Sequence, residues 1–418
     1  MSVCPPEPAL PTTAPDSVRE RLRRLGVGGA GRVPAPPATT SRAPAPIASV
    51  ARPAPVGDGV EVVRATFGRG HRHGRCVLGD TLRTLADVDD LAHTVWLDTE
   101  TTGLAGGTGT YAFLVGLAYL DDDRLVIEQL LLRRLSAERH LLAALAERLG
   151  RARRLVTFNG QRFDWPIIEA RFVLARQQPA AFVVHTDLIH PARRLWHRVL
   201  GTHRLSALEA EVLGAPRYDD VPGWEIPGIY VRYLRDTDRS ALNPILVHNR
   251  SDLLALVLLH GEVARILRSP HDAGVPLDWE GTGVLVGRRG AHATAIECFE
   301  RALDATDRPG DRWRVLQKVT RAHRAAGDAD AARRRWETEA ATWTEPDRLR
   351  AHVLEEVAKT RTKRGDLAGA LAATREALSI AESFPAGIRG LLGKDPAALS
   401  RLADRLRVRL VRLGERDG

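Results

Sequence analysis

Four carboxylates in three short motifs are the residues of this chain best suited to chemistry. The motif DTE contributes Asp98 and Glu100, NGQRFD ends in Asp164, and HNRSD ends in Asp252. Hard divalent cations such as Mg²⁺ and Mn²⁺ take oxygen ligands, and two of them about 3.5–4 Å apart can hold both the attacking and the leaving oxygen of a phosphodiester displacement. If the fold brings the motifs together, they predict a two-metal site that hydrolyses phosphodiester bonds.

The DTE motif ends an apolar run at residues 93–98 that predicts a β-strand. Residues two apart on a strand share one face, so Asp98 and Glu100 are expected to point the same way. Thr101 and Thr102 follow in a turn and are candidates for holding a terminal nucleotide. The glycines at 106–109 match no phosphate-binding fingerprint, and a flexible turn is the preferred interpretation.

The NGQRFD motif follows a predicted strand at 155–158. Gly160 is expected to allow a tight turn, Phe163 to anchor in the core, and Asp164 to project beside the first pair of acids, just before a predicted helix. Asn159 is a candidate substrate ligand. By itself the motif would more simply be explained by a helix cap formed by Asn159 or Asp164.

His248 and Asp252 lie four residues apart in a predicted helix and so share one face. We expect Asp252 to ligate metal and His248 to handle a proton, because imidazoles exchange protons near neutral pH. An isolated pair at this spacing is more often a surface pair. The interpretation depends on all three motifs occurring in order, each at the end or the start of a predicted element.

Alternating strand and helix patterns surround these motifs. The strands are expected at 93–98, 111–120, 125–132, 155–158 and 182–187, the first three as a meander, with helices at 136–149, after Pro166 and beyond 187. The pattern predicts an α/β domain with a mixed five-stranded sheet and flanking helices, in the element order of the ribonuclease-H-like fold. Residues 60–84 predict a small strand or two, with His71 and His73 in a surface loop rather than a metal site.

The three motifs together resemble those of the DEDD superfamily of 3′-to-5′ exonucleases, and the whole chain resembles bacterial proteins that join a ribonuclease-H-like domain to tetratricopeptide repeats. The resemblance extends to stretches at 187–196, 204–209 and 219–227. It implies that Asp98, Glu100, Asp164 and Asp252 bind two Mg²⁺ or Mn²⁺ ions. The two better-known subclasses place a Tyr four residues, or a His five residues, before the last Asp, whereas this chain has His248 at the Tyr spacing.

The composition divides the chain into three parts. Residues 1–57 are rich in Pro, Ala, Ser and Thr and predict a disordered tail, interrupted by an amphipathic stretch at 16–25 that is interpreted as a solvated helix or, alternatively, a docking helix. Residues 58–268 form the predicted catalytic domain. Residues 269–418 are all helical, with glycine cues at Gly290, Gly327 and Gly365 that predict helix-hairpin repeats of the tetratricopeptide type. Such repeats suit a protein partner, and a plain helical bundle is the alternative.

Basic and aromatic residues suggest how a nucleic acid would be held. Arg193 and Arg194 lead a basic cluster beside Trp196 that is either a phosphate channel or a solvated surface; its other members are Arg198, His203 and Arg204. Core packing is preferred over base stacking for three further aromatic residues, namely Trp224, Tyr230 and Tyr233.

The bulk composition favours a polyanionic partner inside the cell. Lys and Arg number 61 against 52 Asp and Glu, and the net charge is +9. Three cysteines without metal-binding spacing indicate a reducing compartment, and no apolar stretch is long enough for a membrane span, so a cytoplasmic protein is expected. The functional hypothesis is a 3′-to-5′ exonuclease on single-stranded DNA or RNA. The alternatives are a structure-specific endonuclease and an inactive nucleic-acid-binding scaffold.

Overall fold

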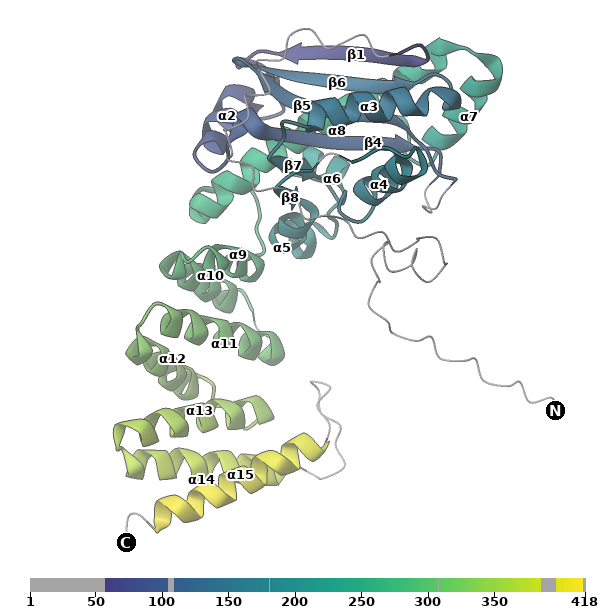
Figure 1. Ribbon diagram of the computed structural model, residues 1–418. Helices are drawn as coiled ribbons and strands as arrows, with labels where there is room; N and C mark the ends of the chain where they lie inside the picture. The colour runs from purple at the N-terminus through teal and green to yellow at the C-terminus, as the bar shows by residue number, and fades with distance from the viewer. Residues whose placement is uncertain (1–56, 104–108, 180, 307, 385–395, 416–418) are drawn as a thin grey trace, which may run out of the picture. The chain divides into compact units, whose positions relative to one another are not determined.

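The computed structural model describes residues 57–103, 109–179, 181–306, 308–384 and 396–415 (Figure 1). The predicted tail at 1–57, except for Gly57, lies outside the described residues, as do the amphipathic stretch at 16–25 and most of the glycine turn at 106–109.

A mixed six-stranded sheet forms the centre of the α/β part, in the spatial order β1-β6-β5-β4-β7-β8. Its strands are β1 (Val60–Phe67), β4 (Thr94–Thr101), β5 (Ala112–Asp121), β6 (Arg124–Leu132), β7 (Arg154–Thr157) and β8 (Val184–Asp187). Strands β4, β5 and β6 form the predicted antiparallel meander, while β7 and β8 continue the sheet in parallel with β4.

The prediction of five strands was wrong by one strand, β1. This strand pairs antiparallel with β6 along its whole length, from Val60 opposite Leu132 to Phe67 opposite Leu125. It pairs with the outer backbone groups of β6, so that β1 instead of β6 forms this edge of the sheet. A separate two-stranded ribbon, β2 (Arg72–His73) with β3 (Cys76–Val77), follows β1.

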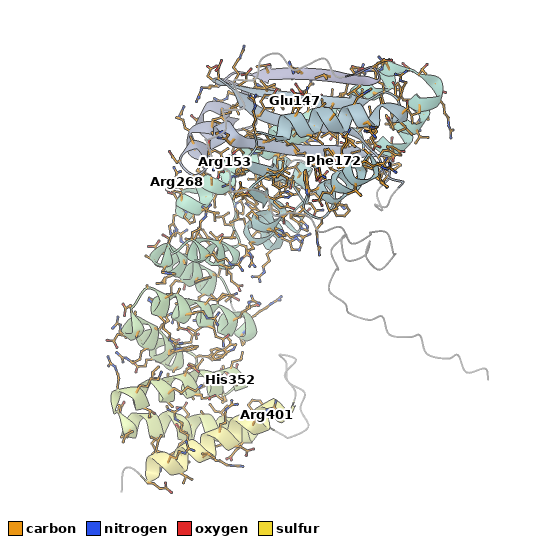
Figure 2. The ribbon with its side chains drawn as sticks, in the orientation of Figure 1. Glu147, Arg153, Phe172, Arg268, His352 and Arg401 are labelled. Carbon is orange, nitrogen blue, oxygen red and sulfur yellow. The ribbon has the colours of Figure 1, made fainter. Side chains whose placement is uncertain are left out.

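Helices cover both faces of the sheet, with α3 on one face and α8 on the other (Figure 1). Strand β4 is apolar on both faces because each face is covered. Val95 and Leu97 are buried in the core beneath α3, and Trp96 is buried in the core beneath α8. The helices of this part are α2 (Leu78–Ala86), α3 (Glu138–Leu149), α4 (Asp164–Leu174), α5 (Ile189–Leu200), α6 (Leu205–Glu211), α7 (Ile226–Asp236) and α8 (Asn243–Arg268). Phe172 of α4 is fully buried on the α3 side (Figure 2).

Helix α8 lies directly on the sheet because β5 has a glycine beneath it. A Cβ atom at Gly116 would lie 2.3 Å from Oδ1 of Asn249 and 2.6 Å from Cδ1 of Leu253, both on α8. Gly116 is also the residue opposite Asp98 in the β4–β5 pairing. The missing side chain therefore lets α8 approach the sheet beside Asp98.

Helix hairpins follow α8. Their helices are α9 (Trp279–Arg288), α10 (His292–Asp304), α11 (Pro309–Ala325), α12 (Ala329–Thr342), α13 (Arg348–Arg364), α14 (Leu367–Ser383) and α15 (Pro396–Gly414). Gly290, Gly327 and Gly365 each precede the second helix of a hairpin with φ of 82–83°, a conformation that favours glycine. Successive hairpins pack together: His352 of α13 lies against Trp313 of α11, with ring centroids 5.5 Å apart (Figure 2).

The first hairpin is tied closely to the α/β part. A Cβ atom at Gly281 of α9 would lie 1.9 Å from the carbonyl oxygen of Arg194 on α5, so only glycine fits there. The neighbouring Glu280 is buried and accepts hydrogen bonds from Arg198 of α5 and Arg314 of α11. The pKa of Glu280 is lowered to about 2, because these bonds and the charge of Lys318 outweigh the opposing effect of burial.

None of the described helices combines the length and the apolar character that crossing a membrane requires. Cys76 and Cys298, the cysteines within the described ranges, are unpaired thiols.

Candidate active site

The end of β4 presents the first two acids. Asp98 and Glu100 alternate with Thr99, and both point to the face that α8 covers, as the two-residue period predicts. Asn249 of α8 donates from Nδ2 to Oδ2 of Asp98 at 2.8 Å, and its own Oδ1 accepts a hydrogen bond from Gln129 at 2.8 Å. Asn249 is fully buried, so this amide fixes the position of Asp98 relative to the sheet.

The third acid, Asp164, is the first residue of α4 and reaches β4 at Thr99. The Thr99 hydroxyl donates to Oδ1 of Asp164 at 2.5 Å. The turn before α4 is held by Asp187 of β8, whose carboxylate accepts from the amides of Asn159 (2.6 Å) and Gln161 (3.1 Å).

The conformation of that turn differs from the prediction in one respect. Asn159, not Gly160, has the positive φ, at 65°. Asn is among the few residues other than glycine that adopt this conformation readily. Gly160 is required for space instead, since a Cβ atom there would lie 2.5 Å from Cβ of Thr157.

The fourth acid lies on α8, one turn after His248. Nε2 of His248 lies 3.4 Å from Oδ2 of Asp252 and 3.8 Å from Oε1 of Glu100. The opposite ring nitrogen, Nδ1, lies 2.8 Å from Oδ1 of Asp220. Because an ionised carboxylate only accepts hydrogen bonds, this pairing places a proton on Nδ1 and directs Nε2 toward the acids.

Arg217 connects Asp252 to a second, more deeply buried carboxylate. Its guanidinium donates to Oδ1 of Asp252 (2.5 Å), to Oε2 of Glu209 (2.5 Å) and to Oδ2 of Asp220 (3.0 Å). Glu209 is fully buried on α6, and its other oxygen lies 2.6 Å from Nε2 of His73. The prediction that His73 is an incidental loop residue is therefore wrong: it closes a network that ends at Asp252.

Burial raises the pKa values of all four acids, and two of them, Asp98 and Glu100, are raised further by the charges of the other acids. Burial, followed by the charges of Asp252, Glu100 and Asp164, raises the pKa of Asp98 well above its usual range. Burial also raises the pKa of Glu100, with further contributions from Asp252 and Asp164, and raises the pKa of Asp164 to about 6. The pKa of Asp252 is raised by burial against the opposing charges of Arg217 and His248. The site thus carries more negative charge than its own cations compensate.

Charge and ligand type fit a divalent cation. Four carboxylates from β4, α4 and α8 are the donors that Mg²⁺ and Mn²⁺ prefer, and a bound cation would relieve the repulsion that raises their pKa values. As the side chains stand, however, no three His, Cys, Asp or Glu residues of the described part of the chain are grouped closely enough to hold one ion. Asp164 is bonded to Thr99 and Asp252 to Arg217, so holding an ion would require side chains to rotate.

A cavity of about 320 Å³ lies beside the acids. Glu100 and Asp164 line it together with Thr101 and Phe163. Phe163 is 52% exposed, so the prediction that it anchors in the core was wrong; the adjacent Trp165 is buried instead. The Thr101 hydroxyl donates to the carbonyl oxygen of Gly103, and the Thr102 hydroxyl accepts from the amide of Tyr111, so both predicted substrate ligands also stabilise their own turn.

The predicted basic cluster divides between two environments. Arg193 and Arg194 lie on α5, and within the described ranges neither guanidinium makes a hydrogen bond or an ion pair. Arg198 forms an ion pair with Glu280. Trp196 is fully buried, so its ring is not exposed for stacking on a base beside these arginines.

The preferred interpretation of the three other aromatic residues holds for two of them. Tyr230 and Tyr233 are buried in the core, whereas Trp224 is 72% exposed.

Sequence reasoning missed the residues that hold the acids. They are Thr99, Asp187, Glu209, Arg217, Asp220 and Asn249. Two of them carried a detectable signal, because Thr99 and Asn249 lie inside the DTE and HNRSD motifs. Asp187, Glu209 and Asp220 lie in the stretches at 187–196, 204–209 and 219–227 that supported the resemblance, but no role was assigned to them.

Comparison with known proteins supports the fold. Residues 95–264 match the family model described as the RNase_H superfamily, a range that contains all four acids and His248. A ribonuclease-H-like domain with a mixed six-stranded sheet is therefore followed in this chain by a helical region.

A relative in Bacillus subtilis (strain 168), the uncharacterized protein YprB, is 34% identical over 217 residues. The matched region covers 48% of this chain and 52% of YprB, so the chain spans about half the length of that relative.

Proposed function

We propose that this chain is a metal-dependent nuclease, and specifically a 3′-to-5′ exonuclease that hydrolyses single-stranded DNA or RNA. One observation carries the proposal: β4, α4 and α8 bring four acids to one buried site, where burial raises all four pKa values and the charges of the other acids add to the shifts of Asp98 and Glu100. Concentrating uncompensated negative charge is costly for stability, and it is expected where a site serves a cation and a reaction. The match of residues 95–264 to the RNase_H superfamily supports the same conclusion.

Asp98, Glu100, Asp164 and Asp252 would hold two Mg²⁺ or Mn²⁺ ions. When bound, such ions lower the pKa of water and neutralise the charge that develops on phosphate oxygens. The carboxylates would bind the ions and keep them at the end of β4, with Asn249 and Thr99 restricting the two acids that they contact. Outer hydrogen bonds of this kind commonly orient metal ligands.

His248 is proposed to accept the proton of the attacking water. Its Nδ1–H donates to Asp220, so Nε2 is available as an acceptor beside Glu100 and Asp252. Burial alone would raise the pKa of Asp220, but the hydrogen bonds and charges of His248 and Arg217 outweigh it and lower the pKa. Asp220 therefore stays ionised and keeps the imidazole in one tautomer.

The cavity beside Glu100 and Asp164 is proposed to receive the terminal nucleotide. Phe163 exposes its ring at this cavity, where a base can stack on it, a contact that tolerates any sequence. Thr101 and Asn159 remain candidates for contacts to the sugar and phosphate. The helix hairpins are proposed to be tetratricopeptide-like repeats that recruit a protein partner or lengthen the substrate path.

The test is a cleavage assay on 5′-labelled single-stranded DNA and RNA with Mn²⁺, Mg²⁺ or chelator. We expect a metal-dependent ladder that shortens from the 3′ end and disappears in Asp98→Asn. Asp123→Asn, which changes an exposed acid in the turn after β5, is the matched control and should cleave normally.

Internal cuts would support the endonuclease alternative. Intact substrate that stays bound in the presence of either metal would contradict the nuclease and favour the scaffold.

A further inference from the structure

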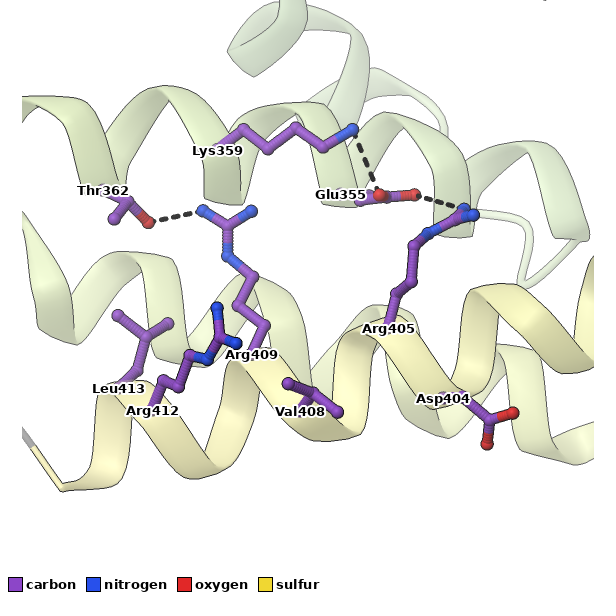
Figure 3. Close-up of a pocket in the computed structure, with 9 residues that line it drawn as sticks. All are labelled: Glu355, Lys359, Thr362, Asp404, Arg405, Val408, Arg409, Arg412 and Leu413. Carbon is purple, nitrogen blue, oxygen red and sulfur yellow. Dashed lines mark hydrogen bonds and ion pairs between the residues drawn. The ribbon is translucent and has the colours of Figure 1, made fainter.

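A second site candidate lies far along the chain from the acids, in the helical region. A groove of about 620 Å³ runs between α13 and α15 (Figure 3). Its charged lining residues are Glu355, Lys359, Asp404, Arg405, Arg409 and Arg412. Four cations thus face two carboxylates.

Both carboxylates already have partners. Glu355 lies 3.0 Å from Nζ of Lys359 and 3.9 Å from Arg405, and Asp404 lies 3.6 Å from Arg407. The pKa of Glu355 is lowered to about 2, because hydrogen bonds from His352 and Lys359 outweigh burial. These acids therefore have little capacity left to neutralise the remaining arginines.

Among the residues that the structure describes, no carboxylate forms an ion pair with Arg409 or Arg412. Arg409 donates to the carbonyl oxygen of Ala358 (2.9 Å) and to the Thr362 hydroxyl (2.6 Å), both neutral acceptors. Arg412 makes no hydrogen bond or ion pair with any residue that the structure describes. Burial lowers the pKa of Arg409 and outweighs the charges of Glu355 and Glu356, which act in the opposite direction.

The spacing of the arginines suits an extended anion. Arg405, Arg409 and Arg412 are four and three residues apart on α15, so they share one helix face at intervals of about 6 and 4.5 Å along the axis. A guanidinium presents a planar fork of donors that matches phosphate oxygens. A single phosphate would use one arginine, whereas a chain of phosphates could use several.

We propose that the groove between α13 and α15 binds the phosphate backbone of single-stranded nucleic acid. The choice of nucleic acid as the polyanion rests on the proposed function. It is favoured over an acidic peptide because six of the nine described residues that line the groove are charged and none of the nine is aromatic, whereas protein partners usually need buried aromatic or apolar anchors. Backbone contacts need only cations, and they carry no sequence preference.

The experiment measures binding by the full chain with Asp98→Asn, which keeps the substrate intact. Fluorescence anisotropy with a labelled 20-mer of dT or rU is recorded from low to high salt. Arg409→Gln with Arg412→Gln should weaken binding about tenfold at low salt and make the slope of log Kobs against log salt shallower by about 1.4, at ~0.7 per phosphate contact on single strands. Arg412→Gln alone, at an exposed residue that makes no hydrogen bond or ion pair with a described residue, should give about half of that change in slope without affecting folding.

The matched control removes two other exposed arginines of the helical region, Arg324 and Arg375, by Gln substitution. An equal loss in the control, or unchanged affinity and slope in the groove variants, would overturn the proposal. Tighter binding of a labelled poly-Glu peptide that is lost in the same variants would overturn it in favour of an acidic protein segment. Cleavage by the unsubstituted chain is scored separately, so a failed groove and a failed nuclease give different results.

Discussion

Nδ1 of His248 and Oδ1 of Asp220 lie 2.8 Å apart, although 27 residues separate them in the chain. This contact sets the direction of the imidazole, because the opposite nitrogen then faces Glu100 and Asp252. A histidine at this helical spacing therefore reaches the acids with its orientation already determined by a carboxylate from outside the helix.

Replacing Asp220 by Asn should reduce cleavage more than binding. The amide can accept or donate, so it no longer selects the tautomer with the proton on Nδ1, and outer partners of this type are typically worth 10–100-fold. We expect kcat to fall about 10–100-fold with KM changed less than about threefold, measured by initial rates on labelled oligonucleotide. ¹⁵N NMR of the His248 ring should show a mixture of tautomers.

Asp219→Asn is the control for this substitution. Asp219 is exposed and adopts a φ of 60°, which Asn tolerates, so its replacement should leave both the rate and the ring spectrum unchanged. A normal rate in Asp220→Asn would exclude an orienting role for Asp220.

Replacing Arg217 by Gln should destabilise the protein. The substitution leaves Glu209, which is fully buried, without its main cation, and breaking a buried ion pair from one side costs about 3–5 kcal/mol. Urea unfolding should show this loss, and adding Glu209→Gln should restore a large part of it. Arg83→Gln, which breaks an exposed pair with Asp80, should cost less than about 1 kcal/mol. Equal losses for the Arg217 and Arg83 variants would contradict the role of the buried network.

The acids could be found in the sequence because their chemistry and their order are local signals. The first motif follows an apolar run and the second opens a helix, whereas the third lies within a helix; β4, α4 and α8 present Asp98, Asp164 and Asp252. The strand alternation also placed Asp98 and Glu100 correctly on one face.

The supporting residues could not be found in this way. Arg217 and Asp220 lie between α6 and α7 in a segment without helix or strand, so no periodicity indicates where they point. The burial of single aromatic residues was equally hard to predict. Phe163 precedes a helix and is exposed, whereas Trp196 lies on the covered face of α5. The sequence did not show that β1 belongs to the main sheet, because its apolar residues do not alternate regularly. Its place in the sheet is set by its pairing with β6, which is distant in the sequence.

Replacing Gly116 by Ala should loosen α8 from the sheet. The added methyl group would overlap Oδ1 of Asn249 and Cδ1 of Leu253, and overpacking of this kind costs about 1–3 kcal/mol. Because Asn249 also holds Asp98, we expect cleavage to fall together with the melting temperature. Gly70→Ala, at a position with open space around it, is the control and should change neither. Unchanged stability in Gly116→Ala would show that α8 can move away without cost.

The metal-free protein should be more stable at pH 5.5 than at pH 8, because the acids of the site are partly protonated at the lower pH. Asp164 has a folded-state pKa of about 6 against 3.8 in the unfolded chain, so the folded state binds more protons between these values. The free energy of unfolding then falls as pH rises from below 3.8 to above 6, by about 3 kcal/mol in all for this group, of which about 0.8 kcal/mol falls between pH 5.5 and pH 8. Asp98 shifts in the same direction. Melting temperatures with chelator at the two pH values measure the effect, and Mn²⁺ should reduce it by replacing protons as the compensating charge.

Substitutions separate this contribution to the pH dependence of stability from the contributions of groups whose pKa shifts act in the opposite direction. Burial lowers the pKa of His185, so its protonation at low pH favours the unfolded state, while Glu280 loses its stabilising effect only as pH falls below about 4.5 toward 2. In Asp98→Asn or Asp164→Asn the stability gained on acidification should therefore shrink or change sign relative to the unsubstituted chain. Asp123→Asn should keep the full dependence, because this acid is exposed on the turn after β5. If both site variants kept the same pH dependence as the unsubstituted chain, the pKa values of Asp98 and Asp164 would not be raised in solution, and the main argument for a cation site would be lost.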